Sequence, residues 1–182
     1  DHRLGTLPAL FERLGEDASS VELAGDRHLT VDEREQLRSV AAELTETCTA
    51  LAQLGVPESV CHLDIWRGNF CVRDGRPFVF DWAESAVAHP FVSLQLMLRD
   101  VRMAIPGDSD AELRVRDVYL TEWAGHGERD QLVEAADRSA CLATVSQALL
   151  LRDALAAMEP HLRMPYQGTI SDMLRDLIRR RG

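Results

Sequence analysis

Apolar residues recur at helical spacing along most of the chain, and the longest regular run follows Thr30. They fall there at three- and four-residue intervals, as on the buried face of an amphipathic helix. Thr30 and Glu33 match a capping box, in which two side chains satisfy amides at the start of a helix. Gly55 and Pro57 supply the stop signals. The pattern therefore predicts a helix from Thr30 to the neighbourhood of Leu54.

The segment before this helix has a weaker pattern. Residues 1–29 are expected to form a lead-in or linker, of the kind that arrives from a preceding domain, and residues 30–182 a helical catalytic and substrate-binding lobe. The run Leu7–Leu14 carries enough apolar positions for two helical turns, and Gly15 is expected to end them.

A β-hairpin is predicted after the first helix. The short runs Phe70–Arg73 and Pro77–Phe80 are rich in β-forming residues, and Asp74-Gly75 joins them. Asp-Gly between two such runs is a strong signal for a two-residue hairpin turn. The hairpin would fix Asn69 at its entry and Asp81 at its exit.

The chain beyond the hairpin is predicted to be helical. One helix opens after Pro90, and a capping-box match at Ser109 and Glu112 starts the next. A long helix is expected over residues 128–158, because its middle is apolar on nearly all sides, as in a central buried helix. A last amphipathic helix begins near Thr169. The predicted fold is mainly α with one small β-hairpin.

Composition narrows the choice of environment and partner. The 182 residues suit one domain, and a hydrophobic content of 46% is ample for a core. No apolar run approaches the ~20 residues of a membrane span, and no secretion signal is recognisable. The four cysteines contain no C-x-x-C pair, which favours reduced thiols in a cytoplasmic protein over a disulfide framework or a zinc site.

The net charge of the chain helps to indicate which class of molecule it binds. The net charge of −10 argues against nucleic acid and is compatible with a cationic small molecule. Acidic residues of the later helices, Asp100 among them, would suit an amine-bearing acceptor, although most are more simply explained as solvated helix faces.

Candidate chemistry is concentrated in residues 61–82. Asp64 lies in a loop, Asn69 follows five residues later, and Asp81 comes just after the hairpin. Phosphoryl transfer needs this set: one carboxylate to orient a hydroxyl and two oxygen ligands to hold Mg²⁺. Each residue alone has a simpler explanation, since a loop Asp binds its own amides, and Asn69 and Asp81 could serve as a turn residue and a strand-end cap. Their combined spacing favours the catalytic interpretation.

Neighbouring residues have supporting or open roles. His62 has no adjacent Ser or Cys to activate, so we expect it to hold the loop by hydrogen bonds. Arg67 would reach a phosphate, although an exposed loop arginine is an equally good explanation. Glu84 is either solvated or directed at the substrate.

Three segments, in this order, closely resemble the aminoglycoside phosphotransferase and choline kinase family: HLDIWRGN at 62–69, FDW at 80–82 and AHPF at 88–91. The resemblance implies a protein-kinase-like (α+β) phosphotransferase fold, ATP as donor, and phosphorylation of a small-molecule hydroxyl. By position, it implies that Asp64 is the catalytic base and that Asn69 and Asp81 are the Mg²⁺ ligands.

The chain departs from the family pattern in four ways. Leu63 stands where the family usually has Gly, Trp66-Arg67 where His-Pro is common, and His89 where the turn usually has Asp. The fourth departure is larger: all 20 basic residues are arginines, and no glycine-rich phosphate motif occurs. Kinases place a lysine on the nucleotide phosphates. We therefore expect the chain to be the C-terminal lobe, with the N-terminal ATP-gripping lobe absent, whether that lobe belongs to the same parent chain or to a separate one.

Two other functions stay open at this point. The missing lysine is compatible with a non-catalytic binding or regulatory module derived from such a lobe. A metal-dependent hydrolase would use the same carboxylates, but the chain lacks the clustered histidine ligands that such enzymes commonly have.

Overall fold

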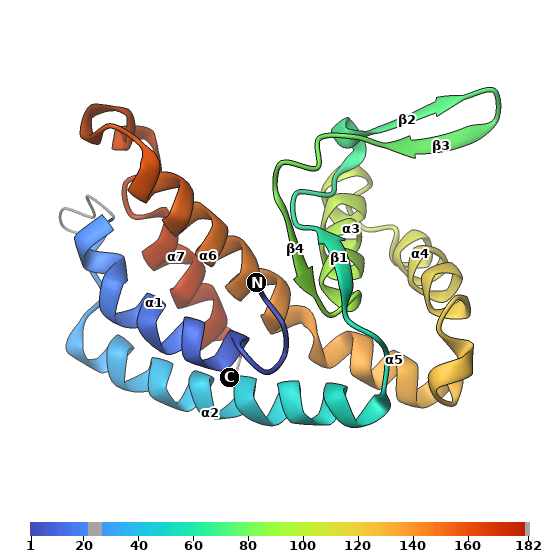
Figure 1. The fold of residues 1–182 in the computed structure, drawn as a ribbon, viewed down its shortest axis with the longest axis horizontal. Coiled ribbons are helices and arrows are strands. Elements are labelled where there is room, and N and C mark those ends of the chain that lie inside the picture. The colour runs from blue at the N-terminus through green and yellow to red at the C-terminus, as the bar shows by residue number, and fades with distance from the viewer. Residues whose placement is uncertain (22–26, 181–182) are drawn as a thin grey trace.

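A computed structural model describes residues 1–21 and 27–180 of the chain, and Figure 1 shows its course. The helices make up most of the molecule, and the strands form two small sheets. In chain order the elements are α1 (Leu7–Val21), α2 (Val31–Leu54), β1 (Ser59–His62), η2 (Arg67–Asn69), β2 (Phe70–Arg73), β3 (Arg76–Val79), β4 (Ser85–Ala88), α3 (Phe91–Ala104), α4 (Ser109–Thr121), η3 (Ala124–His126), α5 (Arg129–Arg138), α6 (Ala140–Ala157), η4 (Pro160–Leu162), η5 (Met164–Tyr166) and α7 (Thr169–Arg179).

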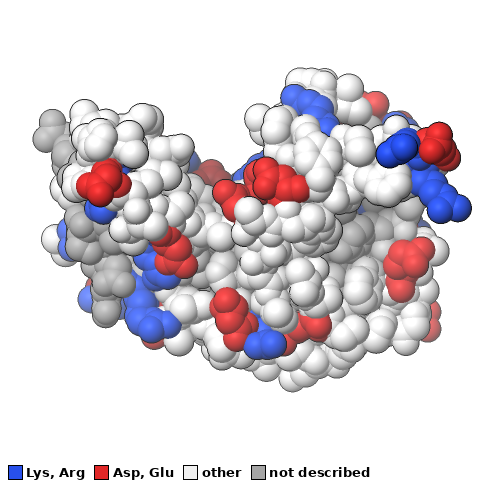
Figure 2. Space-filling view, turned by 45° about the horizontal axis from the view of Figure 1, so that its top comes forward, with Lys and Arg blue, Asp and Glu red and all other residues white. Residues whose placement is uncertain are grey.

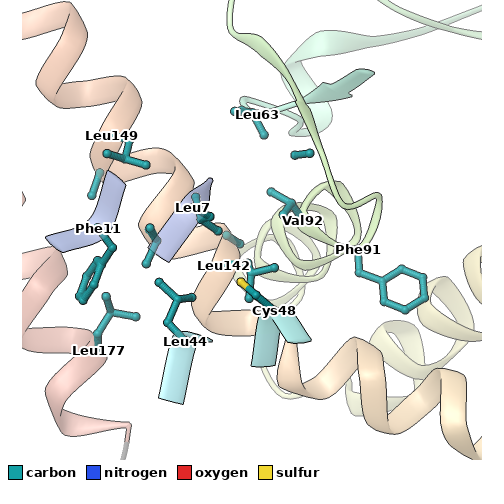
Figure 3. Packing of buried hydrophobic residues seen from close by; sticks show 14 of the residues in the cluster. Leu7, Phe11, Leu44, Cys48, Leu63, Phe91, Val92, Leu142, Leu149 and Leu177 are labelled. Atoms are coloured by element: carbon teal, nitrogen blue, oxygen red, sulfur yellow. The ribbon is translucent and has the colours of Figure 1, made fainter. Parts of the chain in front are cut away.

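Helix α6 lies at the centre of the fold. It packs against α1, α3 and α7, and its apolar side chains are buried on several sides. Figure 3 shows Leu142 and Leu149 of this helix in one cluster with Leu7, Phe11 and Leu44 from the two N-terminal helices. This burial removes apolar surface from water, which is the main favourable term in folding. The prediction of a central buried helix is confirmed.

The N-terminal segment is more ordered than its sequence pattern suggests. Helix α1 runs from Leu7 through Gly15 to Val21, so the expectation of two turns ending at Gly15 is wrong. Leu4, Leu7 and Leu14 belong to the core, because α1 packs on both α2 and α6. The described part of residues 1–29 therefore contributes a helix to the core, while the division of the chain at residue 29 stays a prediction. A glycine does not stop a helix whose apolar face has tertiary partners.

Helix α2 has both predicted ends. The Thr30 hydroxyl accepts a hydrogen bond from the Glu33 amide at 3.1 Å, and the Glu33 carboxylate accepts one from the Thr30 amide at 2.7 Å. Gly55 closes the helix in the left-handed conformation, with φ of 73°, which glycine adopts at little cost. The buried side chains follow the predicted face: Leu37, Val40, Leu44, Cys48 and Leu51.

Two details of the later helices correct the sequence prediction. Asp108, rather than Ser109, is the N-cap of α4, and its carboxylate accepts a hydrogen bond from the Ala111 amide at 2.9 Å. The long helix predicted over residues 128–158 is broken in two at Ser139, whose hydroxyl donates to the Ala136 carbonyl at 2.6 Å. A serine that bonds the backbone of the preceding turn competes with the regular helical ladder and bends the chain.

The stretch Arg129–Ala157 is long and apolar enough to cross a membrane by length and composition. A core helix of a globular protein passes the same test, and Leu142, Val145 and Leu149 of this stretch are buried in the core. The stretch is weak evidence for a span, and the absence of a membrane segment stays a prediction.

Two antiparallel sheets frame the loop between β1 and β2. The predicted hairpin is present as β2 and β3, with Arg73 opposite Arg76 and the turn residues Asp74 and Gly75 at positive φ. The second sheet pairs β1 with β4, from Ser59 opposite Ala88 to His62 opposite Ser85. The expectation of a single hairpin was incomplete, although the mainly α character is confirmed. Figure 1 shows the β2–β3 hairpin projecting beyond the helices.

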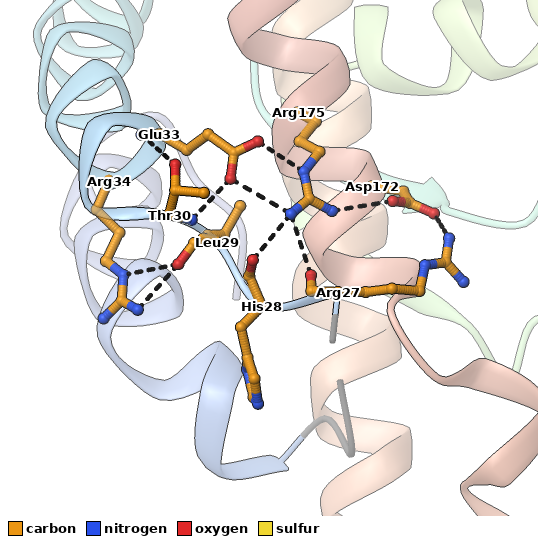
Figure 4. A network of polar contacts seen from close by, with 8 residues as sticks. All are labelled: Arg27, His28, Leu29, Thr30, Glu33, Arg34, Asp172 and Arg175. Atoms are coloured by element: carbon orange, nitrogen blue, oxygen red, sulfur yellow. Dashed lines mark hydrogen bonds and ion pairs between the residues drawn. The ribbon is translucent and has the colours of Figure 1, made fainter. Parts of the chain in front are cut away.

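A polar network joins α7 to the start of α2 (Figure 4). The Arg175 guanidinium donates to the Glu33 carboxylate at 2.7 Å and to the backbone carbonyls of Arg27 and His28 at 3.1 and 3.0 Å. It also pairs with Asp172 on its own helix. The hydrogen bond from Arg175 holds the pKa of Glu33 below its ordinary value. One arginine therefore satisfies an acid and two carbonyls of a segment about 145 positions earlier in the chain.

Replacing Arg175 with Leu is expected to lower the free energy of unfolding by about 2 kcal/mol, since charged hydrogen bonds contribute about 1.5–3 kcal/mol and two carbonyls would lose their donor. Arg138→Leu is the matched control, because Arg138 pairs only with the exposed Glu134 one turn away. That control is expected to cost under about 0.5 kcal/mol. Urea denaturation measures both, and equal losses would contradict the role assigned to Arg175.

Candidate functional site

The catalytic loop predicted around Asp64 is held between the two sheets. The β1–β4 pairing is extended by the Leu63 amide, which donates to the Glu84 carbonyl at 2.8 Å. The one-turn helix η2 then reverses the chain into the hairpin. The Phe80 amide donates to the Asn69 carbonyl at 3.1 Å and closes the open end of the hairpin. Asn69 and the chain just before Asp81 are therefore side by side, as the sequence predicts.

Asn69 is joined directly to Asp64. Its side-chain amide nitrogen donates to the Asp64 carbonyl oxygen at 2.9 Å and to the Asp64 carboxylate at 3.2 Å. The side chain is buried, with 6% of the residue exposed. Among the described residues, none donates a hydrogen bond to the Asn69 amide oxygen. That oxygen remains available for a ligand, which a side chain acting only as a turn residue would not require.

Asp81 has an unusual backbone conformation. Its φ is 62°, in the left-handed region that residues with a Cβ rarely adopt, and the only other positive-φ non-glycine among the described residues is the turn residue Asp74. Such strain is concentrated at functional sites, where the surrounding structure maintains it. Here the residue before Asp81 is fixed by two bonds, from the amide of Phe80 to Asn69 and from the ring of His62 to the Phe80 carbonyl.

His62 links the loop to the exit of the hairpin. Its Nε2 donates to the Phe80 carbonyl at 3.0 Å, and its Nδ1 accepts from the Asp64 amide at 3.2 Å. The Trp82 ring packs against it with a centroid distance of 5.0 Å. The side chain is almost fully buried. These contacts are the ones that a residue supporting the loop would make, and they connect Asp64 to the chain next to Asp81.

Negative charge gathers around this loop. Partial burial raises the pKa of Glu84, and the nearby carboxylates of Asp64 and Asp81 raise it further, while His62 acts in the opposite direction. None of the three acids forms an ion pair with a described arginine or histidine. Figure 2 shows acidic side chains gathered beside a hollow in the face turned towards the viewer. A bound cation would relieve this mutual repulsion.

Arg67 lies beside the site and already has a partner. Its guanidinium pairs with the Asp100 carboxylate at 3.0 Å, and its amide donates to the same carboxylate at 2.9 Å. A role for Arg67 in phosphate binding stays a prediction, because this guanidinium would have to leave or share Asp100. No sequence pattern indicates this pairing: the acids of the later helices are explained most simply as solvated helix faces, yet the Asp100 side chain is only 18% exposed.

The donor set fits Mg²⁺ better than a transition metal. Within residues 1–21 and 27–180, no three His, Cys, Asp or Glu side chains form a group able to hold a metal on their own. Mg²⁺ binds through one or two carboxylates and completes its shell with water and substrate phosphates. The Asp81 carboxylate and the free amide oxygen of Asn69 are oxygen donors of this kind.

Comparison with protein families identifies the family of this chain. A model of the phosphotransferase enzyme family matches residues 2–132, which include the loop around Asp64 and both sheets. The chain belongs to the phosphotransferase enzyme family. The match confirms the resemblance to aminoglycoside phosphotransferases and choline kinases, and the mainly α fold is consistent with the kinase-like fold of this family. Neither the search of curated proteins nor that of solved structures found a match.

The family match also bears on the N-terminal segment. It begins at residue 2, so it includes nearly all of the residues that the sequence pattern assigned to a lead-in. Membership establishes phosphoryl-transfer chemistry at the level of the family.

Neutralising Asp64 is expected to lower the pKa of Glu84 towards its ordinary value of 4.5, because a nearby negative charge disfavours the ionised form. Carbon-13 NMR titration of the Glu84 carboxyl in the Asp64→Asn variant measures this shift. Asp74→Asn, in the hairpin turn, removes an exposed acid and is expected to leave the titration unchanged. An identical pKa in wild type and Asp64→Asn would show that the two carboxylates do not share a site.

Proposed function

We propose that this phosphotransferase catalyses ATP- and Mg²⁺-dependent phosphoryl transfer to a hydroxyl of a small molecule. The observation that carries the proposal is the pair of hydrogen bonds from Asn69 to Asp64, beside a hairpin whose second strand ends at Val79, two residues before Asp81. Together they bring a half-buried carboxylate, a free amide oxygen and a second carboxylate into one electronegative loop. Phosphoryl transfer depends on positioning and charge neutralisation, and this loop offers groups for both.

Asp64 would orient the acceptor. Its carboxylate accepts the proton of the attacking hydroxyl, while that oxygen forms its bond to the γ-phosphorus and the bond from phosphorus to the ADP oxygen breaks. Asn69 donates to this carboxylate and so fixes its direction. His62 fixes the backbone of Asp64 from the other side. A positioned carboxylate of this kind removes the entropic cost of aligning the hydroxyl.

Asn69 and Asp81 would hold Mg²⁺ through one oxygen each. When bound, the metal neutralises charge on the phosphate oxygens during transfer. Two features would favour metal binding. The Asn69 amide oxygen accepts no hydrogen bond from the described residues, and the backbone before Asp81 is fixed in place. The raised pKa of Glu84 reflects the same concentration of negative charge.

A further lobe would supply the grip on the nucleotide. The chain contains no lysine to place on the phosphates. The β2–β3 hairpin and the residues after it expose several large apolar side chains: Phe70, Val72, Phe78, Phe80 and Trp82. Large apolar side chains exposed together on a surface usually mark a site that a partner or a ligand covers. We infer that a nucleotide-gripping lobe, from the same parent chain or another, covers this hairpin, and that the chain itself acts as the C-terminal lobe.

The proposal also covers the cellular location of the enzyme and the type of its acceptor. The four cysteines are free thiols, and burial raises the pKa of Cys48 to about 12, so this thiol stays protonated and unreactive. Free buried thiols support a cytoplasmic location. The acidic character of the chain and of its catalytic loop supports a small-molecule acceptor rather than a nucleic acid.

Transfer of phosphate from ATP to a panel of hydroxyl compounds, with the complete protein and Mg²⁺, tests the proposal. Asp64→Ala is expected to reduce kcat at least about 100-fold, the lower range for loss of a general base. Asp74→Ala, which removes an acid from the hairpin turn, should leave kcat unchanged. Transfer that persists undiminished in Asp64→Ala would contradict the mechanism. No Mg²⁺-dependent transfer to any compound would favour a non-catalytic binding or regulatory module instead.

A further inference from the structure

Arg99 on α3 is anchored to the catalytic loop through one glutamine. Its Nη1 donates to the Gln147 side-chain oxygen at 2.5 Å. The amide nitrogen of Gln147, on the central helix α6, donates in turn to the Leu63 carbonyl at 3.4 Å. Leu63 directly precedes Asp64. A chain of two hydrogen bonds therefore ties the guanidinium to the residue next to the proposed base.

This guanidinium has no carboxylate partner among the described residues. The acid beside it in sequence, Asp100, is engaged by Arg67. Two arginines that act electrostatically on Arg99 have acids of their own, Arg102 with Glu112 and Arg180 with Asp176. Arg99 is therefore a positive charge without a described acidic partner, on the side of the catalytic loop that faces α3 and α6. The protein as a whole has a net charge of −10.

The two hydrogen bonds through Gln147 place Arg99 on the side of the loop where Leu63 precedes Asp64, and the charges around it agree with this position. Partial burial and the charges of Arg102 and Arg180 lower the pKa of Arg99, whereas Asp64 and Asp100 act in the opposite direction. Asp64 also acts on Glu84 across the loop, together with Asp81. Asp64 thus has an arginine on the side of α3 and α6, and the proposed metal ligand Asp81 on the side of the hairpin.

We propose that Arg99 binds an anionic group, a carboxylate, of the acceptor molecule whose hydroxyl is oriented by Asp64, and that Gln147 positions this arginine. The inference rests on the proposed function and specifies its acceptor: a hydroxy acid, in place of the amine-bearing molecule that acidic composition suggests. A guanidinium matches a carboxylate with two parallel hydrogen bonds, and this geometry selects the ligand as well as binding it.

The position of Arg99 favours the acceptor over the nucleotide as the source of the anion. The nucleotide phosphates would lie beside the Mg²⁺ that Asn69 and Asp81 would hold, at the two ends of the hairpin. Arg99 instead projects from α3 and is held by α6, the two helices that pack together behind the loop. An acceptor with its hydroxyl at Asp64 and its carboxylate at Arg99 would lie across Asp64 from the hairpin.

Three compounds that differ at one carbon test the charge preference: glycerate, glycerol and 3-amino-1,2-propanediol. Each offers the same vicinal hydroxyl pattern beside an anionic, a neutral or a cationic group. Their binding to the protein, without nucleotide, is measured by isothermal titration calorimetry. Glycerate is expected to bind at least about tenfold more tightly than the other two, as one charge-assisted interaction permits. Equal binding of the three, tighter binding of the amine, or binding of none would overturn the proposal.

Two variants and a control assign the preference to Arg99. Arg99→Gln is expected to abolish the preference for glycerate, and Gln147→Glu to abolish it as well, by giving the retained arginine a carboxylate of its own. Arg138→Gln, whose arginine pairs only with Glu134 on α5, should keep the full preference. Circular dichroism and the thermal midpoint establish that each variant is folded. A preference that survives Arg99→Gln in a folded protein would overturn the assignment.

Measuring Mg²⁺·ATP binding in the same variants shows whether Arg99 binds the acceptor or the nucleotide. It also distinguishes failure of this inference from failure of the proposed function. If Arg99→Gln weakens Mg²⁺·ATP binding as much as glycerate binding, the arginine serves the nucleotide and the inference is wrong. Arg99-dependent glycerate binding without any phosphotransfer would support the anion site and contradict the proposed function. Transfer that depends on Asp64 but keeps the wild-type KM for each acceptor in Arg99→Gln would support the proposed function and contradict the anion site.

Discussion

The candidate site depends on one buried amide. The Asn69 side chain donates both to the backbone carbonyl and to the carboxylate of Asp64. It thereby ties the loop that follows β1 to the start of the hairpin. Because the nitrogen is used in this way, the amide oxygen, which accepts no hydrogen bond from the described residues, is the atom left for a ligand. Loss of this amide would leave the Asp64 carboxylate without its fixed direction and the proposed metal without a ligand. Helix α3 packs against β1, which carries β4 as its antiparallel partner, and so supports this arrangement.

The features that the sequence predicted well are local ones. The capping box at Thr30 and the Asp-Gly turn of the hairpin depend on residues within a few positions of each other, and both are present. The site residues converge for the same reason. A tight hairpin brings its two ends together whatever the rest of the fold does, so Asn69 and the chain before Asp81 had to meet.

The features that the sequence did not reveal depend on distant partners. The β1–β4 sheet joins residues on either side of the hairpin, and no local turn signal marks such a pairing. Helix α1 passes through Gly15 because α2 and α6 cover its apolar face. The Arg67–Asp100 contact requires α3 beside the loop, and the Arg99–Gln147 contact requires α3 beside α6. Periodicity shows which residues are amphipathic, but it cannot show which neighbour they contact.

Binding of Mn²⁺·ATP tests the central claim most directly, because Mn²⁺ accepts the same oxygen ligands as Mg²⁺ and broadens NMR signals close to it. The account predicts that the amide signals of Asn69 and Asp81 broaden first, and that Asp81→Ala abolishes the effect while Asp74→Ala preserves it. This measurement detects weak binding, so it applies even where another lobe is needed for tight nucleotide affinity. Broadening centred elsewhere on the protein, or unchanged in Asp81→Ala, would contradict a phosphoryl-transfer site in this loop.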